Sequence, residues 1–139
     1  TYAPTLETHT PNETMENNSS QLILDVPEFT LEFLLQVNMP HNDPCWRRTI
    51  HNDYGYFNED YFSAGDFDMW CRAALGGSQF LKISNKPLGL YYRNPNGIST
   101  KASTLGKAVE EVMRVREKYV NLYKNKKGHL GYQQNYLSF

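Results

Sequence analysis

Apolar residues recur along this chain at helical spacing in some stretches and at strand-like spacing in others. From Thr104 to Lys124 the apolar positions lie three or four residues apart, which predicts a long helix with one buried face. The residues expected on that face are Ala108, Val109, Val112, Val115, Tyr119 and Leu122. We therefore expect an α/β domain closed by a long helix over residues 101–125.

Three shorter helices are predicted before the long one. Pro27 suits the first position of a helix and precedes a mostly apolar stretch. A second helix is expected to begin near Pro44 and to end before Gly55. The third covers Asp66 to Leu75, because acidic residues occupy its first turn and two glycines follow its last one.

Short strands are predicted at Leu22 to Asp25, Gln79 to Ser84 and Leu88 to Tyr92. Residues Thr5 to Gln21 are polar and show no hydrophobic period, so an irregular connection is expected there. A sheet of so few strands is marginal by itself. We expect these strands to complete a sheet begun upstream in a longer chain or in a partner.

The 139 residues are enough for one domain. We divide it into a polar segment (1–21), a core (22–100), the closing helix (101–125) and a tail (126–139) whose structure the pattern leaves open. The sequence begins with Thr1 rather than with Met. Its start is therefore expected to be a boundary within a longer protein.

The charge balance excludes some classes of partner. Fourteen basic and 15 acidic residues give a net charge of -1, which offers no electrostatic footprint for nucleic acid. The longest apolar run, Leu22 to Leu24, is too short to span a bilayer. Cys45 and Cys71 cannot form a disulfide framework. We expect a cytoplasmic location, including the cytoplasmic face of a membrane.

Between Pro40 and Thr100 four motifs follow one another. They are Trp46-Arg47, Gly55-Tyr56-Phe57-Asn58-Glu59, Ser63-Ala64-Gly65-Asp66-Phe67-Asp68-Met69-Trp70-Cys71-Arg72 and Gly89-Leu90-Tyr91-Tyr92-Arg93. In this order they resemble the second half of the family-2 glycosyltransferases, which have the GT-A fold. The resemblance implies that the chain is the C-terminal, acceptor-side half of such an enzyme.

Enzymes of this family transfer a sugar from a nucleotide-diphospho-sugar to an acceptor hydroxyl, with inversion at the anomeric carbon. A hydroxyl is a weak nucleophile and needs a base within hydrogen-bond reach, and the resemblance assigns that role to Asp66. Mg²⁺ or Mn²⁺ neutralises the leaving diphosphate in the family. The resemblance assigns the cation and the donor mostly to the N-terminal half. This fragment is therefore expected to hold no cofactor and to be inactive alone.

Each proposed site residue also has a structural interpretation. Asp66 stands where it could cap a helix, and both roles are compatible. The acceptor surface is expected to include Trp46, Arg47, Trp70 and Tyr54, although a Trp also packs in cores and an Arg is often solvated. Asp66 and Asp68 together match the D-x-D motif that binds metal in other proteins. The place of Asp68 in the first turn of a helix, however, favours an interaction with the helix dipole over metal binding.

Two rival functions remain open at this point. The aromatic content of 14% also suits a non-catalytic carbohydrate-binding or interaction module, and a plain α/β domain without a ligand is a third possibility. The tripeptide His41-Asn42-Asp43 is repeated ten residues later, which would place the copies about 80° apart on a helix. We therefore expect no metal site there. Unpaired strand edges predict a homodimer of the fragment.

Overall fold

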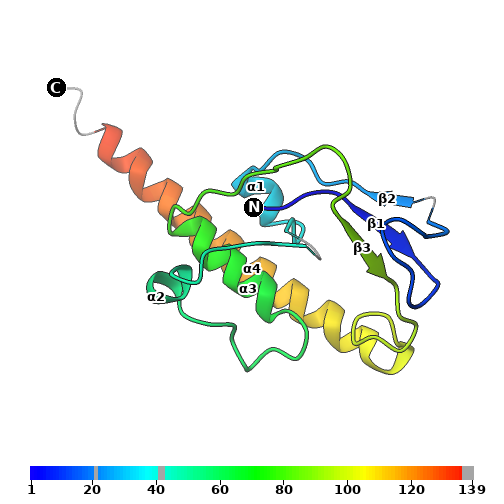
Figure 1. Cartoon of the computed structure of the whole chain (residues 1–139). Coiled ribbons are helices and arrows are strands. Elements are labelled where there is room, and N and C mark those ends of the chain that lie inside the picture. Colours follow the sequence, from blue (N-terminus) through cyan, green and yellow to red (C-terminus); the bar gives the residue numbers. More distant parts are fainter. Residues whose placement is uncertain (21, 41–42, 136–139) are drawn as a thin grey trace.

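The computed structural model describes residues 1–20, 22–40 and 43–135, with backbone only for 128–135, and forms a mixed α/β domain. Its sheet has the order β2-β1-β3 (Figure 1). The strands are β1 (Thr5–Thr8), β2 (Leu22–Leu24) and β3 (Gly89–Tyr92). β1 pairs antiparallel with β2, with Thr5 opposite Leu24, and parallel with β3, with Thr5 opposite Gly89.

The central strand lies where an irregular segment was expected, so that prediction was wrong for Thr5–Thr8. The strand has no alternation of apolar and polar residues, because three of its four side chains are polar. Each of these polar side chains has a hydrogen-bond or ion-pair partner. The Thr5 hydroxyl donates to Asp43, and the buried Glu7 carboxylate lies 3.2 Å from Nη1 of Arg93. A buried polar group is tolerated when it is hydrogen-bonded. The segment after Thr8 contains turns and bends, and Gln21 lies outside the described residues.

Of the other three predicted strands, two are present in the sheet and one is not. Those at Leu22 and Leu88 are confirmed as β2 and β3, with slightly different ends. Gln79 to Ser84 forms only an isolated parallel bridge, between Tyr2 and Lys82, so a strand there was a wrong prediction. β2 and β3 are the outer strands of this sheet, so the strand edges on which the expected homodimer rests belong to them. The homodimer itself stays a prediction.

Two of the helices are short. α1 (Leu31–Leu34) begins later than Pro27, because the Thr30 hydroxyl accepts the N–H of Phe33 and caps the helix there. α2 (Ile50–Tyr54) also begins later than predicted. It ends at Gly55 as expected, where φ is +73°, a conformation that glycine adopts without strain.

The two long helices pack against each other and carry most of the core (Figure 1). α3 (Gly65–Leu75) confirms the third predicted helix. α4 (Ala102–Asn135) is longer than the predicted 101–125, and its last turns extend beyond the rest of the molecule in Figure 1. Part of the expected tail is therefore helical, whereas residues 136–139 lie outside the described residues.

The predicted buried face of α4 is confirmed in part. Ala108, Val115 and Tyr119 are buried as expected and Val112 is half-buried against the core, but Val109 and Leu122 are 51% and 49% exposed. Glu111 is buried in their place. The sequence pattern assigned the face by apolarity, whereas a carboxylate occupies it because it binds backbone N–H groups of a neighbouring loop.

The core lies between α3, α4 and the loop after α1. Its largest buried side chains include Leu34, Met39, Phe67, Trp70 and Tyr119. Among the helices formed by the described residues, none combines the length and the apolar character needed to cross a membrane.

Candidate functional site

A cavity of about 550 Å³ lies against the N-terminal half of α4 and the start of α3. Its polar lining residues are Asn38, Ser63, Asp66, Tyr91, Ser99 and Arg116. Its other lining residues are Ala64, Phe67, Leu105, Ala108, Val109, Val112 and Met113. A cavity of this size can hold a small molecule.

The first turn of α3 brings the Asp66 carboxylate into the wall of this cavity. Oδ1 accepts the N–H of Phe67 at 2.7 Å, so Asp66 does satisfy a free backbone donor of the helix start. Oδ2 accepts Nδ2 of Asn38 at 2.9 Å. The N-cap residue of α3 is Ala64, so Asp66 lies within the first turn and is not the cap that the structural interpretation expected. Each carboxylate oxygen has a further lone pair, so these hydrogen bonds leave acceptor capacity for a ligand.

Two polar atoms near Asp66 are buried and unsatisfied. Asn38 directs its amide nitrogen to the carboxylate, which accepts only, and its Oδ1 has no hydrogen-bond partner among the described residues. Nε of Arg116 likewise finds none within the described chain, although Nη2 donates to the carbonyl of Gln36. Buried polar groups are rarely left unpaired, so both atoms suit a ligand or water.

The loop that leads into Asp66 is held by Glu111 of α4. Its carboxylate accepts the N–H groups of Phe62 at 2.8 Å and Ser63 at 2.7 Å, and that of Ala64 at 3.3 Å. Burial raises the pKa of Glu111, but these backbone hydrogen bonds outweigh it and leave the pKa below its usual value. Glu111 thus remains ionised and fixes the entry of the chain into α3.

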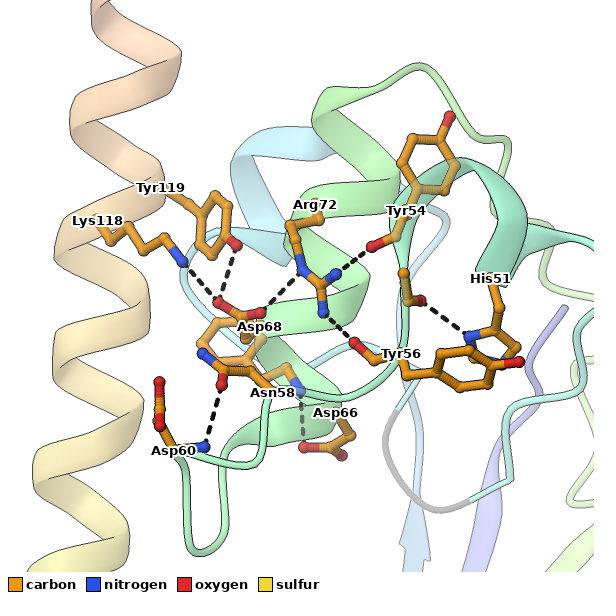
Figure 2. A network of polar contacts seen from close by, with 12 residues as sticks. His51, Tyr54, Tyr56, Asn58, Asp60, Asp66, Asp68, Arg72, Lys118 and Tyr119 are labelled. Carbon is orange, nitrogen blue, oxygen red and sulfur yellow. Dashed lines mark hydrogen bonds and ion pairs between the residues drawn. The ribbon is translucent and has the colours of Figure 1, made fainter.

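The second acid of α3, Asp68, does not line the cavity and belongs to a buried polar network (Figure 2). Its Oδ1 accepts Nζ of Lys118 at 2.9 Å and the hydroxyl of Tyr119 at 2.8 Å. Its Oδ2 accepts Nε of Arg72, also at 2.9 Å. Asp68 lies in the first turn of α3 as expected, but the interpretation as a dipole-stabilising acid missed that it also ties α3 to α4.

Arg72 connects this network to the last residue of α2 and to the loop that follows it. Its guanidinium donates to the carbonyl oxygens of Tyr54 and Tyr56 (Figure 2). Burial raises the pKa of the Tyr119 phenol to about 12, and the Asp68 carboxylate adds to the rise, so the hydroxyl stays a donor. Through Asp68 this network joins α3 to Lys118 and Tyr119 of α4.

A cluster of aromatic side chains surrounds Trp46, which lies edge-on to Trp70 with ring centroids 5.0 Å apart. Phe57 and His51 pack beside Trp46. Trp70 is only 2% exposed and belongs to the core, whereas Trp46 is 38% exposed. The two Trp residues line a cavity of about 40 Å³ that Asp66 does not line.

The remaining predicted acceptor residues lie near this aromatic cluster. Arg47 is exposed in the loop before α2. The Tyr54 hydroxyl donates to the carbonyl of Gly76 at 3.2 Å, and a Cβ at Gly76 would come within 2.2 Å of the Tyr54 ring. The structure therefore brings Trp46 and Trp70 together, but it does not bring them to the cavity of Asp66.

The described residues do not fit the divalent cation that the resemblance implies. In residues 1–20, 22–40 and 43–135, no three His, Cys, Asp or Glu side chains are grouped so that they could hold a metal ion. Asp66 and Asp68 face different partners, and the buried Asp68 carboxylate already binds Arg72, Lys118 and Tyr119. His41 and Asn42 of the repeated tripeptide lie outside the described residues.

Sequence reasoning missed three residues of the Asp66 site: Asn38, Glu111 and Arg116. Asn38 follows a helix that the sequence predicted with the wrong limits. A polar residue within the apolar pattern of α4 was the available signal for Glu111, because it stands between Ala108 and Val115. No local pattern distinguishes Arg116 from a solvated helix residue.

Comparisons with protein-family models, curated proteins and solved structures give no match for this chain. Its function must therefore be argued from the site and from the motifs.

Proposed function

We propose that this chain is the acceptor-side part of an inverting glycosyltransferase of the GT-A fold, with Asp66 as the general base. One observation carries the proposal. The Asp66 carboxylate is held by Asn38 and by the N–H of Phe67 in the wall of a cavity of about 550 Å³. An oriented carboxylate beside a space for a ligand supports the role of a base, which must lie within hydrogen-bond reach of the acceptor hydroxyl.

In the proposed reaction, Asp66 removes a proton from the acceptor hydroxyl. A lone pair of its carboxylate accepts the proton of the acceptor hydroxyl while the hydroxyl oxygen attacks the anomeric carbon of the donor. The bond between that carbon and the diphosphate breaks, and the leaving group departs on the opposite face, which inverts the configuration. Asn38 orients the carboxylate, and Glu111 fixes the loop from Phe62 to Ala64 before it.

The donor, and the divalent cation that accompanies it, are assigned to a segment upstream of Thr1 in a longer protein. The chain alone should therefore release no nucleoside diphosphate when it is incubated with a panel of nucleotide-sugars and Mn²⁺. The longer protein should transfer the sugar, and proton NMR of the product should show the inverted anomer. Retention of configuration, or turnover by the chain alone, would contradict the proposal.

A second candidate is a non-catalytic carbohydrate-binding module. The exposed aromatic side chains of Trp46, Tyr56 and Phe57, which are 38%, 70% and 44% exposed, favour it because sugars stack on such rings. Titration with soluble oligosaccharides, followed by tryptophan fluorescence, tests it. Saturable quenching that disappears in Trp46→Ala and persists in Asp66→Asn would support this candidate.

A further inference from the structure

The α4 wall of the Asp66 cavity is apolar and open to solvent. Leu105, Val109 and Met113 are four residues apart and thus form one stripe along the helix. They are 43%, 51% and 60% exposed, and all three line the cavity. Exposed apolar side chains that line a cavity indicate an apolar ligand surface.

One charged group of the cavity, Arg116, stands toward one end of this stripe, whereas Ser99 precedes the other end. Arg116 lies on α4 beyond Met113, about 16 Å along the helix from Leu105. Its Nε is an unused donor among the described residues, and Oδ1 of Asn38 is an unused acceptor there. A hydroxyl both donates and accepts, so a hydroxyl-rich group can satisfy both atoms.

The charges in the cavity indicate an uncharged head group. Asp66 and Arg116 are the charged side chains among its described lining residues, and they have opposite signs. A phosphate would be attracted by Arg116 and repelled by Asp66, whereas a sugar hydroxyl can bind to either group.

We propose that this cavity binds an amphiphilic glycoside, with its sugar at Asp66, Asn38 and Arg116 and its apolar aglycone along Leu105, Val109 and Met113. The inference rests on the proposed function and names its acceptor class. The sugar satisfies the buried polar atoms, and the aglycone covers the apolar stripe. Each methylene removed from water tightens binding about fourfold.

Three probes test this inference on the 139-residue chain, by NMR titration of the ¹⁵N-labelled protein below the critical micelle concentration. They are n-octyl β-D-glucopyranoside, methyl β-D-glucopyranoside and octyl tetraethylene glycol ether. If three methylenes are buried, the octyl glucoside should bind roughly 60-fold more tightly than the methyl glucoside. It should also bind at least tenfold more tightly than the ether, which has the same chain without a sugar.

A matched pair of variants locates the aglycone. Met113→Gln removes an apolar side chain from the cavity wall, and Leu122→Gln removes one of similar exposure from the same helix outside that wall. Both positions are about half exposed, so both variants should fold. Met113→Gln should weaken octyl glucoside binding about tenfold, and Leu122→Gln should leave it unchanged. In the unmodified chain, nuclear Overhauser contacts should join the octyl chain to the Val109 and Met113 methyl groups.

Three results would overturn the inference. Equal affinity for the octyl and methyl glucosides would overturn the inference. Equal loss in Met113→Gln and Leu122→Gln, or equal binding of the ether, would also overturn it, because it would show adsorption of a surfactant without recognition of the sugar. These tests need neither donor nor turnover. Their failure is therefore distinct from the failure of Asp66 as a base, which is measured by sugar transfer.

Discussion

Nδ2 of Asn38 donates a 2.9 Å hydrogen bond to Oδ2 of Asp66, and this contact joins the loop after α1 to the first turn of α3. Phe67 N–H holds the other carboxylate oxygen at 2.7 Å. With both oxygens held, the carboxylate has a fixed direction relative to the cavity. The base proposed for this site is therefore positioned before any acceptor binds, which lowers the entropic cost of reaction.

The network around Asp68 should stabilise the fold without contributing to the site. Asp68→Asn leaves the charges of Lys118 and Arg72 without their buried partner, so the free energy of unfolding should fall by about 2–4 kcal/mol. Tyr119→Phe removes one hydrogen bond and should cost about 1 kcal/mol. Urea denaturation of both variants measures these losses. A change below 0.5 kcal/mol in Asp68→Asn would contradict the role of Asp68 as the link between α3 and α4.

Glu111 should make the stability depend on pH. Its pKa is lowered on folding, so its contribution is fully present above the unfolded pKa of about 4.3 and is lost as the pH falls through the lower folded value. Glu111→Gln should therefore lower the free energy of unfolding by about 2–3 kcal/mol at pH 7, and by much less near pH 3. Glu110→Gln, at an exposed neighbouring position, is the control and should change little. A loss independent of pH would show that packing, and not the charge, explains the effect.

The two cysteines should react very differently with a thiol reagent. Burial and the nearby Asp68 carboxylate raise the pKa of Cys71 to about 12, whereas Cys45 is exposed. The thiolate is the reactive form. In the folded chain at pH 8 only one thiol per chain, that of Cys45, should react with a chromogenic disulfide reagent. The Cys71 thiol should react only after the chain is unfolded in urea. Two fast equivalents without urea would mean that the core around Cys71 is open.

The two Trp residues should differ in their effect on stability. Trp70 is 2% exposed, so Trp70→Ala should lower the free energy of unfolding by about 3–5 kcal/mol. Trp46 is 38% exposed, so Trp46→Ala should cost less than about 2 kcal/mol. Thermal and urea denaturation test both values. Equal losses would contradict the assignment of Trp70 to the core and of Trp46 to the surface.

Elements with a local signal could be predicted from the sequence. α3 has acids in its first turn and glycines after its last, and α2 ends at a glycine with positive φ. β1 could not be predicted, because Glu7 and its polar neighbours are satisfied by residues as distant as Arg93. The pattern of apolar residues predicted the buried face of α4 only in part, because it could not foresee that the Glu111 carboxylate would be buried to bind a loop.

The candidate site could be predicted only in part. The helix start at Asp66 and its motif identified the carboxylate. Asn38 and Arg116 reach the same cavity from distant parts of the chain, and only the fold brings them together. Conversely, Trp70 has the motif position of an acceptor residue but lies in the core, because a large aromatic ring gains more from burial there.

The most direct test of the account is the rate of sugar transfer by the longer protein that we propose contains this chain, with and without Asp66→Asn. The amide cannot accept the hydroxyl proton, so turnover should fall by roughly 10²–10⁴-fold. Donor affinity should be unchanged, because the donor is assigned to the upstream segment, and circular dichroism should show the same fold. A turnover within a few-fold of the unmodified protein would contradict the account and leave Asp66 with a structural role in the first turn of α3.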